Sequence, residues 1–318
     1  MKKMLKRKFN DSGIGVKILL VYIVFASLFF AIALALLQIS FYIYSGELYE
    51  KSVQELDYFS QNVNRDLAEA ESSNYSMAMD TYVQQTLREM SKAEYPSVEY
   101  NQFTYMLRNQ LLNEYSPESC VRTIIYIDLY GNKSEVGTAS WEIPDNAIEK
   151  IKTSMYDANG AYVTYEPTEE CPYMLTGRIV RNRIDMSLNQ MGYLIYVCDV
   201  RGVIRQNKQR LESQNATVHV YSGDNTIYKD ENAKEIKGIT SYQDKSGYKI
   251  MTEDGKKYFV SYLYADETGW MYVDYFPYSD IYGQVQTMRT LLFIGFLVVF
   301  LALVWCMKRI SFVVTEPL

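Results

Sequence analysis

Two long apolar runs dominate the hydropathy pattern, one near each end of the chain. The first covers Ile18 to Leu37 and the second Leu291 to Met307, with almost no polar side chains in either. Neither run shows the polar stripe at helical spacing that a helix buried in a soluble protein carries. Both are long enough to cross the hydrocarbon core of a bilayer. The pattern therefore predicts two transmembrane helices, over 18–38 and 290–307, with residues 39–289 folded between them.

The polar chain that follows the first run keeps a helical period. Apolar residues recur at spacings of three, four and seven from Val53 to Ala70, and no proline or glycine occurs from Glu47 to Tyr95. This pattern predicts one long amphipathic helix that continues directly from the first apolar run. Two further helices are predicted, one from Thr81 with Asp80 as its cap and one from about Val98 to Leu112.

The period changes to that of strands at Val121. Apolar residues alternate up to Leu129, and Gly131-Asn132 then marks a turn. The following pattern predicts an αβ unit over about 92–200. Its expected elements are a helix at Pro144–Tyr156, strands at Ala161–Tyr165, Tyr173–Val180 and Gly192–Val200, and a linking helix at Val203–Leu211.

A second, strand-rich unit is predicted over about 215–278. Its Glu253-Asp254-Gly255 turn is typical of a β-hairpin. Pro277 is expected to end the sheet, and Ser279 to cap a helix that enters the second apolar run. The expected strands are Val218–Tyr221, Tyr248–Met251, Lys257–Tyr264 and Trp270–Phe276.

Charges next to the apolar runs predict the orientation. Six cations precede the first run and Lys308 and Arg309 follow the second, and cationic flanks stay cytoplasmic. Residues 1–17 and 308–318 are therefore expected inside the cell and the middle outside. Removing the flanking charges leaves 24 cationic against 36 acidic residues, a net charge of −12 for 38–290, which argues against nucleic acid as a partner. A cleaved signal peptide ending near Ala33-Leu34-Ala35 is the alternative, although the apolar stretch is longer than such a segment.

Cysteine and histidine limit the chemistry. The chain has four cysteines, Cys120, Cys171, Cys198 and Cys306, with no CxxC pair, and one histidine, His219. This composition predicts no metal site and no cofactor, and it excludes a Ser-His-Asp triad and a multi-histidine zinc site. A Cys120–Cys171 disulfide stays open. A glycosidase-type carboxylate pair also stays open, because acidic residues are plentiful.

Tyrosine is the unusual component. Of 30 tyrosines, 29 lie in residues 38–290. A tyrosine ring has an apolar face and a hydrogen-bonding tip, which suits a pocket for a small polar ligand or a sugar. Most of these tyrosines are nevertheless expected to be ordinary strand residues.

Several local motifs resemble a known family. They are Tyr126-Ile127-Asp128 with its Gly131 turn, the run from Met155 to Gly160, Thr268-Gly269-Trp270, and Pro277-Tyr278-Ser279. Together with the layout, they resemble the double Cache sensor of bacterial receptors, especially YesM-like sensor histidine kinases. The resemblance implies an α+β fold with two transmembrane helices flanking an extracytoplasmic double Cache (tandem PAS-like) domain with a long N-terminal helix. The tail that ends Thr315-Glu316-Pro317-Leu318 resembles the start of a HAMP linker.

The same resemblance implies a ligand site in the membrane-distal unit. Tyr156, Tyr173 and Asp199 match positions of the amino-acid-binding motif in this family, whereas Thr153, Met155 and Ala158 stand where it has Arg, Trp and Asp. The loss of that Arg removes a bidentate carboxylate clamp, and YesM-like receptors are often associated with sugar use. The expected ligand is a sugar, an amino acid or an organic acid. The expected ligand-binding residues are Tyr126, Tyr156, Tyr173, Arg178, Tyr196 and Asp199.

The function implied by the resemblance is ligand sensing and transmembrane signalling in a two-component sensor histidine kinase. It implies a homodimer in the cell membrane that reaches a response regulator through a cytoplasmic part beyond this chain. No catalytic residue is identified within the chain. The alternatives are the same sensor on a chemoreceptor, a cyclase or a transmembrane transcription regulator, a membrane-tethered hydrolase, and an adhesive ectodomain.

Overall fold

The computed structural model describes residues 14–117, 119–139, 142–210, 217–230, 244–253 and 255–315. The chain divides into two compact units. The terminal unit consists of Met1–Ser52, Ile250–Phe259 and Pro277–Leu318, and the central unit of Val53–Lys249 and Val260–Phe276.

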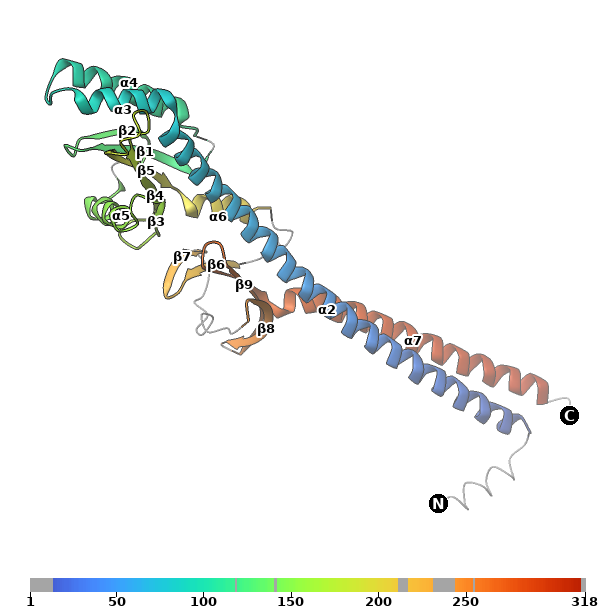
Figure 1. Ribbon diagram of the computed structural model, residues 1–318. Helices are drawn as coiled ribbons and strands as arrows, with labels where there is room; N and C mark the ends of the chain where they lie inside the picture. Colours follow the sequence, from blue (N-terminus) through green and yellow to red (C-terminus); the bar gives the residue numbers. More distant parts are fainter. Residues whose placement is uncertain are drawn as a thin grey trace. The chain divides into compact units, whose positions relative to one another are not determined.

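Helix α2 is a single helix of 66 residues, Ile14–Met79 (Figure 1). It confirms the long helix that the apolar period predicted. Helices α3 (Thr81–Lys92) and α4 (Val98–Glu114) follow, and each begins at a side-chain cap. Asp80 accepts a hydrogen bond from the amide of Val83, as predicted, and Ser97 accepts one from the amide of Tyr100. These caps satisfy amides that have no partner inside the helix.

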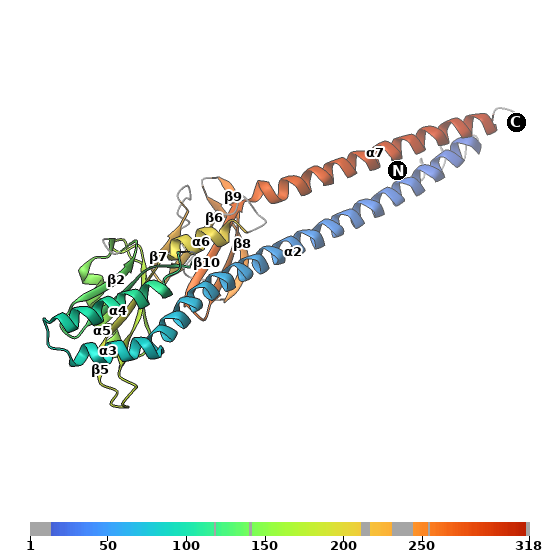
Figure 2. The same cartoon turned by 90° about the horizontal axis from the view of Figure 1, so that it is seen from above.

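The first sheet lies entirely in the central unit. Its five antiparallel strands run in the order β2-β1-β5-β4-β3. Helices α3 and α4 lie side by side (Figure 2), and α5 (Asp145–Asp157) packs on β3 and β4. The strands are β1 (Val121–Asp128), β2 (Lys133–Gly137), β3 (Val163–Tyr165), β4 (Met174–Arg181) and β5 (Gln190–Cys198).

Strand alternation gives this sheet two separate cores. In β1, Ile124 and Tyr126 belong to the core shared with α2, α3 and α4, which we call the helix-side core. Ile125 and Ile127 belong to the core shared with α5, which we call the α5-side core. Successive strand residues point to opposite faces, and both faces are covered, so the central strands are apolar at nearly every position.

The turn after β1 explains the Tyr126-Ile127-Asp128 motif. Asp128 Oδ1 accepts hydrogen bonds from the amides of Tyr130 and Asn132, at 2.8 and 2.7 Å. Gly131 has φ +87°, a conformation that residues with a Cβ rarely adopt. The carboxylate and the glycine together fix the reversal into β2, a strand that the sequence pattern did not predict.

The second sheet has the order β7-β6-β10-β9-β8. Helix α6 (Val200–Lys208) precedes it along the chain. β7 was not predicted, whereas the sheet ends at Pro277 as predicted, with Pro277 as the last residue of β10. The strands are β6 (Thr217–Ser222), β7 (Asn225–Lys229), β8 (Ser246–Glu253), β9 (Lys256–Ala265) and β10 (Trp270–Pro277).

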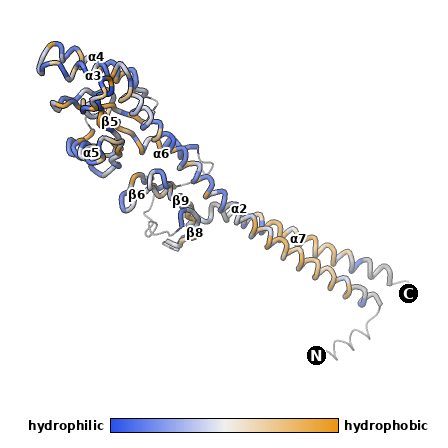
Figure 3. Tube along the Cα trace, in the orientation of Figure 1, coloured by the Kyte–Doolittle hydropathy of each residue, from blue (hydrophilic) through white to orange (hydrophobic). Residues whose placement is uncertain are grey.

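Helix α7, Tyr278–Thr315, starts immediately after β10. Two stretches, within Val21–Met79 and over Gln286–Cys306, are long and apolar enough to cross a membrane, and Figure 3 shows them as the most hydrophobic parts of α2 and α7. Inside the terminal unit, the Phe30 ring lies 5.3 Å from that of Phe300 and 6.4 Å from that of Phe293. The two apolar stretches therefore contact each other through aromatic side chains.

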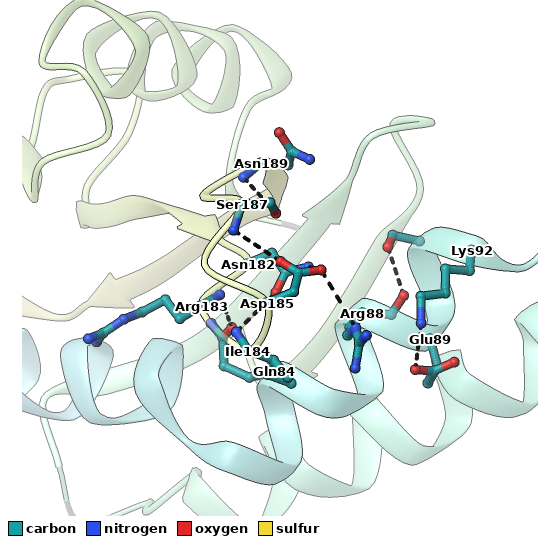
Figure 4. A network of polar contacts seen from close by, with 11 residues as sticks. Gln84, Arg88, Glu89, Lys92, Asn182, Arg183, Ile184, Asp185, Ser187 and Asn189 are labelled. Atoms are coloured by element: carbon teal, nitrogen blue, oxygen red, sulfur yellow. Dashed lines mark hydrogen bonds and ion pairs between the residues drawn. The ribbon is translucent and has the colours of Figure 1, made fainter.

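A polar network ties the loop between β4 and β5 to α3 (Figure 4). Gln84 donates to the carbonyl of Arg181 at 3.2 Å and accepts from the amide of Arg183 at 3.1 Å. Asp185 accepts from the side chain of Asn182 at 3.0 Å and lies 3.8 Å from Arg88. Side-chain hydrogen bonds and an ion pair thus hold the loop against α3.

Candidate functional site

A cavity of about 730 Å³ opens in the central unit between α2, the segment that follows α4, the start of β1, the end of β5 and α6. Side chains from all five regions line it, and most of them are polar or charged. It is the main candidate site in the part of the chain that the structure describes. The lining residues used below are Arg65, Asp66, Glu69, Ser73, Glu114, Cys120, Arg122, Tyr196, Asp199 and Arg210.

A chain of hydroxyl and carboxylate groups crosses the cavity wall. Ser73 Oγ donates to Glu114 Oε1 at 2.6 Å and lies 3.3 Å from the hydroxyl of Tyr196. Tyr196 is fully buried in the helix-side core, and this burial raises the pKa of its phenol. The phenol therefore stays neutral and acts as a hydrogen-bonding group.

Asp199 sits at the corner where β5 becomes α6. Its carboxylate accepts the amide of Gly202 at 2.8 Å as the helix cap and lies 3.3 Å from an Arg122 guanidinium nitrogen. The sequence placed Asp199 at the end of a strand, but β5 ends at Cys198 and α6 begins at Val200, three residues earlier than predicted. Capping rather than strand pairing holds the carboxylate at the cavity edge.

The other charged groups of the cavity are largely paired with one another. Asp66 accepts from the side chain of Asn207 at 2.9 Å and lies 3.5 Å from Arg65. The wall carries four carboxylates, of Asp66, Glu69, Glu114 and Asp199, against three guanidinium groups. The surplus of acceptors suits a ligand that donates hydrogen bonds.

Arg178 belongs to a separate cluster on the same face of the sheet. Its guanidinium lies 5.0 Å from the ring centre of Tyr75 and 5.3 Å from that of Tyr162, and its Nε donates to Asn74 at 2.8 Å. Burial lowers the pKa of Arg178, and the nearby Glu71 acts in the opposite direction. The planar cation is held by stacking and one directed hydrogen bond.

The remaining expected site residues lie elsewhere. Tyr126 is buried in the helix-side core and donates to the carbonyl of Met191 at 2.7 Å. Tyr173 packs against the α5-side core and donates to Glu142 at 2.5 Å. Tyr156, in the last turn of α5, is 72% exposed. Of the six residues, the cavity brings together Tyr196 and Asp199.

All four cysteines are free thiols, and the histidine is a buried strand residue. Cys171 is buried in the α5-side core, whereas Cys120 packs against the helix-side core, so the Cys120–Cys171 pairing left open by the sequence is not present. His219 is buried in β6, with Nδ1 2.9 Å from the hydroxyl of Tyr221. Among the described residues, no group of three or more His, Cys, Asp or Glu is arranged to hold a metal ion.

Sequence reasoning missed the residues that α2 contributes. Asp66, Glu69 and Ser73 occupy polar positions of an amphipathic helix, and such positions usually face solvent. Arg122 was missed as well, because it occupies a polar position in a strand whose residues alternate in polarity. The spacing of three and four places Asp66, Glu69 and Ser73 on one helix face, but it does not show that this face is covered.

Comparison with known proteins gives one curated relative and a group of similar structures. No protein-family model matches the chain. The chain is 23% identical over 301 residues to sensor histidine kinase YesM of Bacillus subtilis, covering 93% of this chain and 52% of that protein. The chain therefore spans about half the length of the curated relative that it matches.

The structural matches concern sensor domains. A domain of a sensory box/GGDEF family protein from Vibrio parahaemolyticus matches with a TM-score of 0.51 and 12% identity, over 74% of this chain and 97% of that one. The ligand-binding domain of the Pseudomonas aeruginosa amino-acid chemoreceptor PctB gives 0.49 and 14%, over 74% and 98%.

The structural match confirms the predicted fold class, and the curated relative confirms that the chain resembles a YesM-like sensor histidine kinase. The two apolar helices that flank the sensor domain support a membrane location.

Proposed function

We propose that this chain is the ligand-sensing and transmembrane-signalling region of a two-component sensor histidine kinase, and that it binds a small polar solute in the cavity beside Tyr196. The observation that carries the proposal is the cavity itself. It is lined on one side by α2, the same continuous helix that carries the first apolar stretch. A solute that contacts Asp66, Glu69 or Ser73 therefore acts on a helix that enters the membrane.

The proposed solute is an uncharged polyhydroxylated molecule of the sugar class. Two of the three cavity cations already lie near carboxylates, Arg122 near Asp199 and Arg65 near Asp66. A further carboxylate from an organic acid would have to compete for those cations, whereas hydroxyl donors suit the surplus of carboxylates. An amino acid, whose ammonium group would also suit that surplus, is the second candidate.

Tyr196 and Asp199 are the proposed contact residues. Tyr126, Tyr156, Tyr173 and Arg178 stay predictions of the sequence, and the binding experiment below tests Tyr156 among them. Both termini are proposed to be cytoplasmic and the cavity extracytoplasmic, because the cationic residues flank the two apolar stretches on the outer ends of the chain. We also propose a homodimer, a cytoplasmic HAMP linker and kinase beyond residue 318, and a response regulator as the downstream partner.

The signal is proposed to be a shift between two positions of α2. A solute changes that equilibrium only through its different affinity for the two states. A change from 1:99 to 99:1 requires a difference of about 10⁴-fold. The Ser73–Tyr196 contact lies where α2 meets the sheet, so it is the place where solute binding acts on the helix.

The test is binding to the whole chain in lipid nanodiscs. Melting temperature is measured against a panel of sugars, amino acids and organic acids, and the dissociation constant of any hit by calorimetry. Tyr196→Phe should weaken binding roughly 5- to 10-fold through one lost hydrogen bond, and Asp199→Ala roughly 10- to 100-fold. Tyr156→Phe serves as the matched control outside the cavity. An unchanged dissociation constant in Tyr196→Phe and Asp199→Ala, with a loss in Tyr156→Phe, would remove the cavity as the site.

The same preparation distinguishes the sensing hypothesis from the alternative of a membrane-tethered hydrolase. A sensor binds the solute saturably and returns it unchanged, whereas a hydrolase converts a glycoside to products during the incubation. Product formation that disappears in an acidic-residue variant would replace the sensing proposal. The type of cytoplasmic output is tested by extending the reading frame beyond the codon of Leu318 and assaying autophosphorylation of the longer protein.

A further inference from the structure

Cys120 lines the cavity, and a second thiol, that of Cys198, lies behind it in the helix-side core. Val121, the first residue of β1, pairs with Cys198, the last residue of β5, and the amide of Asp199 donates to the carbonyl of Cys120 at 2.8 Å. Cys120 and Cys198 therefore stand at the neighbouring ends of two antiparallel strands. Directly opposed residues of an antiparallel pair lie about 4.5–5.5 Å apart at Cα. Cys120 is one residue from the partner of Cys198, and a disulfide spans Cα separations up to about 7 Å.

Both thiols lie on the same face of the sheet. Cys120 Sγ is 3.5 Å from the carbonyl of Asp66 on α2, and the residue packs against the helix-side core. Cys198 is fully buried in that same core. The neighbouring Cys120 thiol, and burial after it, raise the pKa of the Cys198 thiol.

The other cysteines are placed away from this pair. Cys171 belongs to the α5-side core, which the sheet separates from the helix-side core. Cys306 lies on α7 of the terminal unit, within the apolar stretch. Cys120 and Cys198 are therefore the natural partners for an intrachain disulfide.

We propose that Cys120 and Cys198 form a disulfide-switching site, with Cys120 as the attacking thiol and Cys198 as the resolving thiol. Cys120 is half-buried and lines the cavity, so a small molecule reaches it, whereas Cys198 is behind it. The oxidant class is a low-molecular-weight aliphatic disulfide. This inference stands apart from the proposed solute, because it depends on neither Tyr196 nor any ligand.

The exchange takes place in two balanced steps. The Cys120 thiolate attacks one sulfur of the small disulfide, which breaks the S–S bond, forms a mixed disulfide and releases one thiolate. Cys198 then loses its proton and attacks the Cys120 sulfur, which releases the second thiolate. In total, two protein thiols and one small disulfide give one protein disulfide and two small thiols.

The product would fix the cavity wall. It would join the ends of β1 and β5 covalently and close a loop containing residues 121–197. Cross-linking a long loop stabilises the folded state mainly by restricting the unfolded chain. Oxidation is therefore expected to raise the melting temperature by roughly 5–10 °C and to restrict the movement of β1 against β5.

The test uses the whole reduced chain in nanodiscs, incubated with 2-hydroxyethyl disulfide. Free thiols are then alkylated, and the protein is digested without reductant for mass spectrometry. The expected product is a Cys120–Cys198 linked peptide, the loss of two thiols per chain and the rise in melting temperature. The rate of closure should increase between pH 7 and pH 9, because Cys198 must lose its proton.

Matched variants make the result decisive. Cys171→Ser and Cys306→Ser should still close the bond, whereas Cys120→Ser and Cys198→Ser should not. If the buried Cys198→Ser variant fails to fold, the half-buried Cys120→Ser variant carries the comparison. A mixed disulfide that persists on Cys120, a Cys120–Cys171 peptide, or full alkylation of both thiols after long incubation at pH 9 would each overturn the proposal.

Discussion

The hydroxyl of Tyr196 on β5 lies 3.3 Å from Ser73 Oγ on α2, and Ser73 in turn donates to Glu114 at the end of α4. Three elements of the central unit are therefore joined by polar atoms at the wall of one cavity. A buried phenol needs a partner for its hydroxyl. Any solute that takes over one of these hydrogen bonds changes how α2 is held against the sheet.

Ser73 and Tyr196 should act as one unit in binding. Ser73→Ala and Tyr196→Phe are each expected to weaken solute binding roughly 5- to 10-fold, and the double variant by less than the product of the two. Calorimetry on the four proteins measures this coupling. Ser154→Ala, which removes a hydroxyl bonded within α5, should bind as the parent does. Independent effects of the two substitutions would show that the hydroxyls do not cooperate.

Asp274 should make stability fall as pH rises. The side chain is 5% exposed in β10, and burial, with Glu55 as the next cause, raises the pKa of Asp274 to about 7. Lys208 opposes the rise and Asp230 adds to it. The group is neutral in the folded chain at pH 5 but ionised in the unfolded chain above its ordinary pKa of 3.8. Stability should therefore be full below about pH 4 and decrease up to about pH 7, by about 1.4 kcal/mol per pH unit.

Asp274→Asn should remove that decrease. The variant keeps the shape without a proton to lose, so it should match the parent near pH 4 and unfold at higher urea concentration at pH 8. Asp185→Asn is the control, because Asp185 is exposed and hydrogen bonds to Ser187 lower its pKa. That control should leave the slope between pH 5 and pH 8 unchanged. An equal slope in the parent and Asp274→Asn would show that Asp274 does not titrate in this range.

The sequence predicted the elements whose pattern is strong. Asp80 caps α3 and the 66-residue α2 is unbroken, because a carboxylate before an apolar period and the absence of proline are local signals. β2 and β7 were missed, since each has five residues with several polar side chains. Pairing with a neighbouring strand, rather than their own pattern, holds them in the sheet.

The site was less predictable than the fold. The resemblance led to Tyr126 as a ligand-binding residue, but its hydroxyl donates to the carbonyl of Met191 inside the core. Asp199 was selected as the end of a strand and is instead a helix cap. Asp66 and Ser73 reach the cavity only because α2 packs on the helix side of the sheet, and sequence spacing alone does not say which helix face is covered.

Arg178 should not be replaceable by lysine. A guanidinium stacks between Tyr75 and Tyr162 while its Nε reaches Asn74, and an ammonium group has neither the plane nor the fixed donor. Arg178→Lys is expected to cost about 1–2 kcal/mol, a drop in melting temperature of roughly 2–6 °C. Arg108→Lys on the exposed side of α4 is the matched control. Equal melting temperatures for both variants would mean that the stacking contributes nothing measurable.

Gly192 should tolerate no side chain. A Cβ at this position in β5 would lie 2.5 Å from the carbonyl oxygen of Ile127 and 2.5 Å from the hydroxyl of Tyr126. Both obstacles are fixed, one by the β1–β5 ladder and the other by the hydrogen bond to Met191. Gly192→Ala is therefore expected to destabilise the fold by about 3 kcal/mol, at the upper end of overpacking costs, as measured by urea unfolding.

A second substitution shows how much of the destabilisation by Gly192→Ala comes from the Tyr126 hydroxyl. Tyr126→Phe removes the hydroxyl that a Cβ at Gly192 would meet, at a cost of about 1 kcal/mol for its own lost hydrogen bond. Added to Gly192→Ala, it should restore part of the stability, so that the double variant is more stable than the two single costs predict. The rescue should be incomplete, because the carbonyl oxygen of Ile127 and the ring carbon Cζ of residue 126, 2.5 and 2.6 Å from the Cβ position, remain in place. Gly46→Ala in α2, where a Cβ meets nothing within 4 Å, should leave stability unchanged or raise it. Strict additivity of Gly192→Ala and Tyr126→Phe would instead mean that the strand moves away from β1 as a whole, and that the phenol is not the obstacle.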